Sequence, residues 1–447
     1  MKLTIYFEEE FLGVYPSLIN AITLLSPHCS RVEIITSERK SNFPNPPKFP
    51  DNVIFHKIRQ RYVYDRNRFE TTIPSFKFNQ NVTIHPSFWK AIFPEALKIE
   101  YRRIRDLVIH NIEFWKNQYL WFRDKIKYYY FSLYKSSNSK PEILIAVDNS
   151  GLIAASIVCF FSKAKPTLVF WSLELDTGVS PLILKRLHDW FFSKCIKLSD
   201  ALIIQEKSRL ELLCKKLNTD FHFLDIFLIP HSPIGDYQTP NRKPDVCNNF
   251  FRKKFSLDAS EKIILHAGWI HDAMCVDKIA ETSKSWKSNY RLVLHEREKR
   301  SPNEPFIQYV SSLSGNKTLL SLNPVSFDRM EEVFSSADIG IIAYEKKYGE
   351  GRENAHKASG KLGQYLKCGI PVIALDLPGY SEMFLRYRCG MVFQDFASIE
   401  NCIDEILEDY EFFRKEALRC FQAEFDFRKF FQPLINYAHS IKPGPQV

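Results

Sequence analysis

The chain begins as an alternation of short apolar runs and segments with helical spacing. Residues 3–7 and 31–35 are rich in β-branched and aliphatic side chains, and residues 15–25 carry apolar side chains three and four positions apart. This pattern predicts a β-α-β unit with parallel strands. The alternation then resumes, with strands expected at 143–146, 167–171, 201–204 and 226–229 and helices near 151–161 and 182–198. We therefore expect one doubly wound domain over residues 1–235.

A polar segment separates this pattern from a second alternation of the same kind. The stretch SPIGDYQTPNRKPDVCNNF has few apolar residues and three prolines, which is typical of a connection between domains. Beyond it the pattern predicts strands at 263–267, 291–295, 318–322, 339–343, 372–375 and 391–393, with helices near 276–286, 306–313 and 327–335 and from 361. We expect a second Rossmann-like α/β domain at residues 250–420, with one helical segment closing the chain over about 399–438.

The segment at 86–135 is unusually basic and aromatic. Apolar residues recur there at intervals of three or four, which predicts one helix with a single inward stripe: Tyr101, Ile104, Val108, Ile112, Trp115, Tyr119, Phe122, Ile126 and Tyr129. Trp121, Phe114, Tyr128 and Phe131 fall off this stripe and are expected to face outward. The helix either packs on its own domain with a solvated charged face or lies in a membrane interface. Nucleic acid is disfavoured, because no known nucleic-acid-binding pattern accompanies the basic residues.

Charge and cysteine content indicate which partners and which cellular compartment to expect. The 447 residues include 61 Lys and Arg against 52 Asp and Glu, and the net charge of +9 favours anionic partners such as phosphates or an acidic lipid surface. Ten cysteines without a CxxC pair or a zinc-type spacing indicate reduced thiols, no bound metal and a cytoplasmic protein. The most apolar window, 143–161, contains Asp148, so we expect no membrane span and at most peripheral attachment to the inner face of a membrane.

The stretch SGKLGQYLKCGIPVIA, beginning at Ser359, carries the clearest chemical signal. Ser359 and Gly360 open a helix, whose first amides and positive dipole end can hold a diphosphate, and Lys361 adds a charge in the first turn. Gln364 lies on the same face one turn later, where its amide can bind a ribose diol. The alternative is an ordinary capped helix before a strand.

This stretch, with SSADIGIIAY before it and GMVF after it, resembles the donor-binding half of GT-B glycosyltransferases, in particular family 4 and its relatives. The resemblance implies two Rossmann-like domains, with a nucleotide-sugar bound by the second and an acceptor by the first. It also implies that the final segment, residues 421–447, crosses back to the first domain as a helix and tail.

The resemblance transfers donor-binding roles to individual residues. Gly268 matches the glycine that lets the backbone approach the donor phosphates, Ser359, Gly360, Lys361 and Leu362 match the phosphate-binding helix start, and Gln364 stands where the family has a ribose-binding Glu. His295 and Arg297 end a strand beside the expected nucleobase pocket, although a solvated charged loop is an equal alternative. Trp269 and Met274 stand where the family has an Arg and a Lys, so phosphate charge falls mainly to Lys361, helped by His271, Lys357 or Arg352.

Two residues are candidates for catalysis. Glu174, in WSLELDTG, matches a carboxylate of some relatives, with a helix-capping loop residue as the alternative, and His356 replaces the family's carboxylate eight positions before Gln364. The chain contains no DxD triplet, which indicates metal-independent transfer by helix dipoles and cations. Retention, as in most of family 4, needs no protein base, whereas inversion would require Glu174 or His356.

The sequence therefore predicts a cytoplasmic glycosyltransferase that needs no cofactor and moves a sugar from a nucleoside-diphosphate sugar to a glycan or lipid-linked hydroxyl. A non-catalytic GT-B-like binding protein and a GT-B sugar-nucleotide epimerase remain alternatives. A dehydrogenase is disfavoured, because no strand is followed by GxGxxG.

Overall fold

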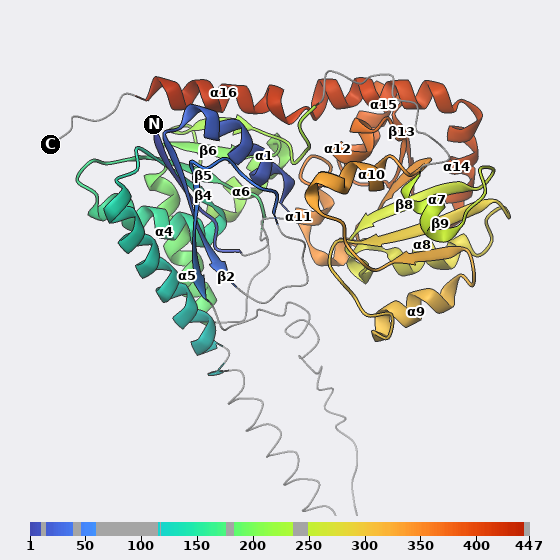
Figure 1. Cartoon of the computed structure of the whole chain (residues 1–447), viewed down its shortest axis with the longest axis horizontal. Coiled ribbons are helices and arrows are strands. Elements are labelled where there is room, and N and C mark those ends of the chain that lie inside the picture. Colours follow the sequence, from blue (N-terminus) through green and yellow to red (C-terminus); the bar gives the residue numbers. More distant parts are fainter. Residues whose placement is uncertain are drawn as a thin grey trace, which may run out of the picture.

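The computed structural model describes residues 1–9, 15–38, 46–59, 115–116, 118–175, 183–235 and 249–441, which form two α/β halves side by side (Figure 1). The first half is built on a seven-stranded parallel sheet in the order β3-β2-β1-β4-β5-β6-β7. Its strands are β1 (Lys2–Tyr6), β2 (Arg31–Glu38), β3 (Val53–Arg59), β4 (Ile143–Val147), β5 (Thr167–Trp171), β6 (Ala201–Ile204) and β7 (Asp225–Leu228).

The second half repeats this design with a six-stranded parallel sheet in the order β10-β9-β8-β11-β12-β13. Its strands are β8 (Lys262–Gly268), β9 (Tyr290–Glu296), β10 (Thr318–Ser321), β11 (Ile339–Ile342), β12 (Val372–Leu375) and β13 (Gly390–Phe393). The two sheets confirm the expected α/β class with two Rossmann-like units. Strand β3 was not expected, because its mixed polar sequence directly follows the Pro-rich stretch.

Helices cover both faces of each sheet, as the burial of near-continuous apolar strands requires. In the first half these are α1 (Pro16–Leu25), a helix over residues 118–139, α4 (Asp148–Phe161), α5 (Ile183–Cys195) and α6 (Lys207–Leu217). In the second half they are α7 (Phe250–Phe255), α8 (Val276–Ser283), α9 (Pro305–Leu313), α10 (Met330–Phe334), α11 (Glu350–Glu353), α12 (Gly360–Lys367), α13 (Tyr380–Tyr387), α14 (Ile399–Glu408) and α15 (Tyr410–Glu424). The chain then forms α16 (Phe427–Ser440).

The final helix lies on the first half, as Figure 1 shows. Phe427, Phe431 and Leu434 of α16 join the core cluster that contains Leu18 of α1, whereas α15 packs in the core of the second half. The single segment predicted at 399–438 is wrong in one respect, because it is three helices. The last break falls before Asp426, whose carboxylate accepts a hydrogen bond from the Arg428 amide and so begins a new helix.

The predicted orientation of the aromatic helix is only partly right where the structure describes it. Tyr129 of the predicted stripe packs against the core of the first half, as expected. Trp115, Tyr119 and Ile126 were expected to face inward and are exposed, whereas Tyr128 was expected outward and is fully buried. Trp121 and Phe131 are half-buried. Phe114 and the part of the predicted stripe at 101–112 lie outside the described residues.

The buried face of this helix explains the error. Tyr128, Ser132 and Ser136 lie four residues apart and are all buried against the sheet. The Tyr128 hydroxyl donates to the Ile35 carbonyl at 3.1 Å, and Ser136 lies 2.5 Å from the Tyr6 hydroxyl. Small serines let the helix approach the strands closely, so its buried face is partly polar and its aromatic stripe is left outside. Apolar periodicity alone could not identify that face.

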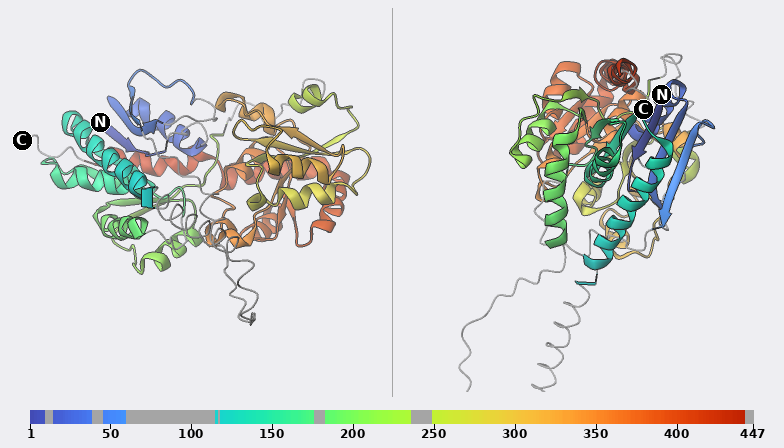
Figure 2. Two further views of the ribbon diagram at one scale, coloured as in Figure 1. Left: turned by 90° about the horizontal axis from the view of Figure 1, so that it is seen from below. Right: turned by 90° about the vertical axis from the view of Figure 1, so that its left-hand side faces the viewer.

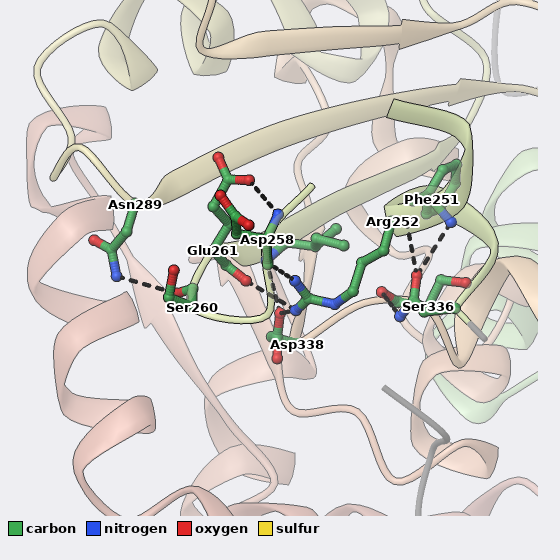
Figure 3. Close-up of polar contacts among 10 residues, drawn as sticks. Phe251, Arg252, Asp258, Ser260, Glu261, Asn289, Ser336 and Asp338 are labelled. Carbon is green, nitrogen blue, oxygen red and sulfur yellow. Dashed lines mark hydrogen bonds and ion pairs between the residues drawn. The ribbon is translucent and has the colours of Figure 1, made fainter. Parts of the chain in front are cut away.

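A polar network fixes α7 at the edge of the second sheet where the strands begin (Figure 3). Arg252 of α7 donates to the Glu261 carbonyl at 2.8 Å and lies 3.3 Å from Asp338, whose carboxylate also accepts from the Ile263 amide at 2.8 Å. Ser336 accepts a hydrogen bond from the Phe250 amide. These contacts are structural, because ligands of open α/β sheets bind at the opposite edge, where the strands end.

Two further findings concern the cysteines, metal binding and membrane-spanning helices. The nine cysteines among the described residues are free thiols, and the described ranges hold no group of three or more His, Cys, Asp or Glu side chains placed to bind a metal ion. No helix in the described part of the chain is long and apolar enough to cross a membrane.

Candidate functional site

The carboxyl edges of the two sheets meet, and the loops that follow their strands touch. An added Cβ at Gly351 of α11 would lie 2.7 Å from the carbonyl oxygen of Leu175, in the loop after β5, so only glycine fits there. Arg209 of α6 donates to the Gly351 carbonyl at 2.9 Å and to the Leu173 carbonyl at 3.3 Å. The predicted site residues therefore lie around a junction between the two halves.

Helix α12 begins at this junction, as the SGK motif predicts. Ser359 is its N-cap residue, but the serine side chain makes no capping bond and instead accepts a hydrogen bond from the Tyr344 hydroxyl at 2.5 Å. The first amides of an α-helix have no partner within the helix, and the helix dipole is positive at this end. The start of α12 can therefore hold an anion.

Lys361 lies at the centre of the site. Its ammonium is 3.7 Å from the Met274 sulfur and 5.2 Å from the centre of the Tyr344 ring. A Cβ at Gly268, the last residue of β8, would be 3.4 Å from the Lys361 nitrogen, so the absence of a side chain at Gly268 leaves room for this ammonium. Gly268 has a φ of +136°, which also favours glycine.

The charges of two arginines act on this lysine. Burial, together with the positive charges of Arg297 and Arg352, lowers the pKa of Lys361 to about 7. The resemblance singled out Lys361 and Arg297, and it offered Arg352 only as a helper. In the structure both arginines are close enough to Lys361 to act on its charge.

Arg297 is held by an aromatic stack. The rings of Trp269 and His271 lie 4.2 Å apart and nearly parallel, and the Arg297 guanidinium is 5.6 Å from the centre of the Trp269 ring. His271 also accepts a hydrogen bond from the Ala273 amide, which fixes the turn after β8. The structure thus brings Trp269, His271 and Arg297 together in the loops after β8 and β9.

Glu296, which the sequence analysis did not identify, supports this arrangement. Its fully buried carboxylate accepts hydrogen bonds from the Ile270 amide at 2.9 Å and from the Arg297 amide at 2.8 Å. Burial raises the pKa of Glu296 to about 7. The side chain therefore ties the loop after β8 to the end of β9.

His295 lies apart from this group. Its Nδ1 is 2.9 Å from the Ser321 hydroxyl, and its ring packs against Phe250 and Phe251 of α7. Burial and the Lys254 charge lower the pKa of His295 to about 4. Adjacent residues of a strand point to opposite faces of the sheet, so the structure does not bring His295 to the expected nucleobase pocket.

The remaining predicted residues of α12 are buried. The Gln364 side chain is 6% exposed and lies one turn after Lys361, whereas Leu362 belongs to the hydrophobic core. Leu362 can therefore contribute only its backbone amide to a ligand. Gly360 faces His231 across the junction, because a Cβ at Gly360 would lie 3.4 Å from the His231 ring.

A carboxylate pair forms the opposite side of the junction. Glu174 is exposed after β5, close to where the sequence placed it. Asp148, the first residue of α4, accepts hydrogen bonds from the Leu173 amide at 2.8 Å and from the Glu174 amide at 2.9 Å. Burial, together with the Glu174 and Glu9 charges, raises the pKa of Asp148 to about 8. Asp148 was not identified from the sequence. Its φ of +54°, which is unusual for a residue other than glycine, is visible only in the structure.

His356 holds the two halves together. Its Nδ1 lies 3.0 Å from a carboxylate oxygen of Glu206, the residue before α6. Gly379 packs directly against its ring, with no room for a Cβ. His356 is thus placed in a contact between the halves.

The sequence analysis also missed His231, in the loop after β7. Its amide donates to the Lys357 carbonyl at 2.7 Å, and its Nε2 is buried without a hydrogen-bond partner among the described residues. Burial lowers the pKa of His231 to about 4. Its position in IPHSP, where the chain leaves the first sheet, is the one sequence feature that marks it.

The fold is similar to solved structures of two-domain glycosyltransferases. Sucrose-phosphate synthase from Thermosynechococcus elongatus aligns with a TM-score of 0.62 at 12% identity over 99% of both chains. HepE from Anabaena, solved with UDP-glucose, aligns with a TM-score of 0.62 at 11% identity over 98% of this chain and 100% of that one. WaaG, a glycosyltransferase involved in lipopolysaccharide biosynthesis, gives 0.54 at 12% identity over 96% and 98%.

These similarities show that the chain has the GT-B fold, as the sequence analysis expected. No protein-family model matches the chain, and no curated protein matches it in sequence. The narrower likeness to family 4 stays a prediction.

Proposed function

Starting from the GT-B fold, we propose that this protein transfers a sugar from a nucleoside-diphosphate sugar to an acceptor hydroxyl. The observation that carries the proposal is the buried Lys361 ammonium beside Gly268 in the first turn of α12, where the charges of Arg297 and Arg352 also act on it. Three like charges in a desolvated site repel one another, and a bound diphosphate would relieve that repulsion. HepE, which shares the fold, was solved with UDP-glucose, and this favours a UDP-sugar as donor.

In this proposal the second half binds the donor. The diphosphate lies against the amides of Gly360 and Lys361, with the Lys361 ammonium beside Gly268. The buried Gln364 amide holds the ribose one helical turn away. When the sugar leaves, negative charge grows on the diphosphate, and fixed dipoles and cations stabilise it without a metal ion.

The first half binds the acceptor in the same proposal. Asp148 and Glu174 present two carboxyl groups across from the donor cations. Carboxyl groups bind sugar hydroxyls well, which suits a glycan or a lipid-linked glycan as acceptor. We propose retention of configuration, with the leaving diphosphate taking the acceptor proton. A product of inverted configuration would instead require a protein base, for which Glu174 is better placed than His356, because His356 already contacts Glu206.

Donor binding can be tested without knowing the acceptor. UDP-, GDP-, ADP- and TDP-sugars are screened by thermal shift, since a ligand that binds only the folded state raises the melting temperature. We expect a shift with one nucleotide class and a loss of about a hundredfold in affinity for Lys361→Met, as is typical when one member of a buried charge contact is removed.

The matched control is Lys367→Met, at the other end of the same helix, where Lys367 pairs with Glu331 at the surface. This variant should bind the donor as the wild type does. No shift with any nucleotide sugar, or equal shifts for wild type and Lys361→Met, would contradict the proposal. Tight binding with neither transfer nor hydrolysis would support the non-catalytic alternative, and isomerisation of the donor without an acceptor would support an epimerase.

A further inference from the structure

The helix over residues 118–139 leaves an apolar stripe uncovered. Tyr119, Ile126, Tyr130 and Tyr134 are exposed and lie on one helical face, opposite the buried Tyr128. Tyr130 is 73% exposed, which is unusual for a large aromatic side chain. This stripe points away from the first sheet.

Two neighbouring helices continue the surface. Leu187, Trp190 and Phe191 of α5 are exposed opposite the buried Phe192, and Phe160 at the end of α4 is 81% exposed. Helices α4 and α5 pack against each other, and the 118–139 helix contacts α5 through ring contacts of Trp121 and Tyr129 with His188. The three helices cover the same face of the first sheet (Figures 1 and 2). Their exposed residues therefore form one surface, which we call the outer helical face: Tyr119, Ile126, Tyr130, Tyr134, Leu187, Trp190, Phe191 and Phe160.

Basic side chains lie among these apolar residues. Lys135 is 5.7 Å from the centre of the Tyr134 ring, and Lys194 is 5.7 Å from the centre of the Trp190 ring. More basic residues lie on or directly after the same helices: Lys127, Lys163, Lys165, Arg186 and Lys197.

Acidic residues are kept off the outer helical face. The three helices contain Asp124, Asp148 and Asp189 as their acidic residues. Asp124 is buried, Asp148 lies at the junction between the halves, and Asp189 is half-buried beside Lys185 and His188. The surface is therefore both apolar and positively charged.

We propose that the outer helical face binds an anionic lipid bilayer. Tyr and Trp rings are amphipathic and prefer the level of the headgroups, and lysines beside them can reach the lipid phosphates. A second copy of the chain is a poor occupant, because a two-fold interface would bring lysines against lysines. The apolar residues lie on helices that cover one face of the first sheet, which suits an interface that they enter only shallowly.

Membrane binding by the outer helical face would also orient the candidate site. Helix α4 begins at Asp148, on the acceptor side of the junction, and runs from there along the outer helical face. A chain bound in this way holds its acceptor side next to the membrane, within reach of a lipid-linked acceptor. Vesicle binding itself does not depend on sugar transfer, so the two proposals can fail separately.

The test is flotation of the full chain with vesicles of phosphatidylcholine alone and of an equal mixture with phosphatidylglycerol. We expect binding to the mixed vesicles only, weakened by salt because the charges are at the surface. The triple variant Tyr130→Ser, Tyr134→Ser, Trp190→Ser should bind at least about tenfold more weakly, since it removes exposed aromatic anchors. The double variant Lys194→Gln, Lys197→Gln should lose about tenfold as well, from two surface charges.

The matched control changes exposed apolar residues elsewhere. Tyr309→Ser and Leu385→Ser lie in the second half, are 51% and 82% exposed in the wild type, and should leave vesicle binding unchanged. Unchanged circular dichroism and an unchanged melting temperature without ligand would show that every variant is folded. Wild-type protein that fails to bind mixed vesicles, or a triple variant that binds like the wild type, would overturn the proposal. A wild-type dimer that the triple variant dissociates would overturn it too, in favour of a second copy.

Discussion

The two sheets present opposite charges to the same junction. In the first half Asp148 begins α4 directly after β4, and burial together with nearby carboxylates raises its pKa to about 8. In the second half Lys361 lies in the first turn of α12, and burial together with nearby guanidinium groups lowers its pKa to about 7. Burial favours the neutral form of both groups. Neighbouring groups with the same charge add to this effect: carboxylates at Asp148 and guanidinium groups at Lys361.

This difference shows that the loops after the strands, and not the α/β scaffold, determine the charge that each half presents. Both halves use parallel strands, helices on both faces and a helix start at the carboxyl edge of the sheet. The loops that follow the strands supply carboxylates on one side and cations on the other. A fold built twice can thus bind a diphosphate and a polyhydroxyl acceptor facing each other, because function lies in the residues added to the scaffold.

Removing Arg209, which connects the two halves at the junction, should have the largest effect on the free energy of unfolding. Arg209 is buried, lies among Asp148, Glu174 and Glu206, and donates across the junction to the Gly351 carbonyl. Arg209→Met leaves the Glu174 and Glu206 carboxylates without their shared cation and the Gly351 carbonyl without its donor, so we expect the free energy of unfolding to fall by about 3 kcal/mol or more. Urea unfolding followed by circular dichroism measures this change.

Arg329→Met is the control for the loss of an arginine. Arg329 forms an exposed ion pair with Glu332, and such pairs contribute little, so its loss should leave the free energy of unfolding almost unchanged. Equal losses for Arg209→Met and Arg329→Met would mean that the junction does not depend on the buried arginine.

The cationic side can be tested with two glycines that both have a positive φ. Gly268→Ala places a methyl group 3.3 to 3.5 Å from the end of Lys361, whereas Gly315→Ala meets no atom within 4 Å. Both changes strain the backbone and should cost about 1 kcal/mol in the free energy of unfolding. Gly268→Ala alone should weaken donor binding, by about tenfold, because it displaces the ammonium that we assign to the diphosphate. Titration calorimetry with the donor separates the two effects, and equal affinities would place the diphosphate elsewhere.

The acidic side should show the smallest effect and a defined pH dependence. The folded protein keeps a proton on Asp148 up to about pH 8, while an unfolded chain releases it near pH 4. The wild type therefore loses stability as the pH rises through this window, and Asp148→Asn removes the loss while keeping the acceptor for the Leu173 and Glu174 amides. We expect the variant to gain about 1 kcal/mol at pH 6 relative to pH 5, because one proton held only by the folded state changes the free energy of unfolding by roughly 1.4 kcal/mol per pH unit. Thermal unfolding at both pH values measures it, and a gain that does not grow with pH would show that Asp148 is ionised throughout.

Much of the fold could be predicted from the sequence, because apolar runs that are buried on both faces leave a plain pattern. Strands β5, β6 and β12 begin and end at the residues expected. The orientation of the 118–139 helix could not be predicted, because apolar residues lie on both of its faces and serines on the buried one. Strand β3 was missed because its alternation includes His and Lys.

The candidate site was predictable only where a motif fixes local geometry. Gly268, Ser359 and Lys361 come together because a strand end and a helix start in one Rossmann-like unit meet at the same edge. Asp148 and His231 were missed, because their surroundings come from segments far apart in the chain. The rotation of His295 out of the site depends on the register of β9, which apolar spacing did not define closely enough.

The most direct test of the central claim is proton uptake on donor binding. At pH 8 most of the free protein carries a neutral Lys361, and a diphosphate beside it would restore the charged form. Titration calorimetry at pH 8, in two buffers of different ionisation enthalpy, should show uptake of roughly one proton per UDP-glucose, or per whichever nucleotide sugar gives the largest thermal shift, and none for Lys361→Met. Binding without proton uptake, or equal uptake by the variant, would contradict a diphosphate site at Lys361.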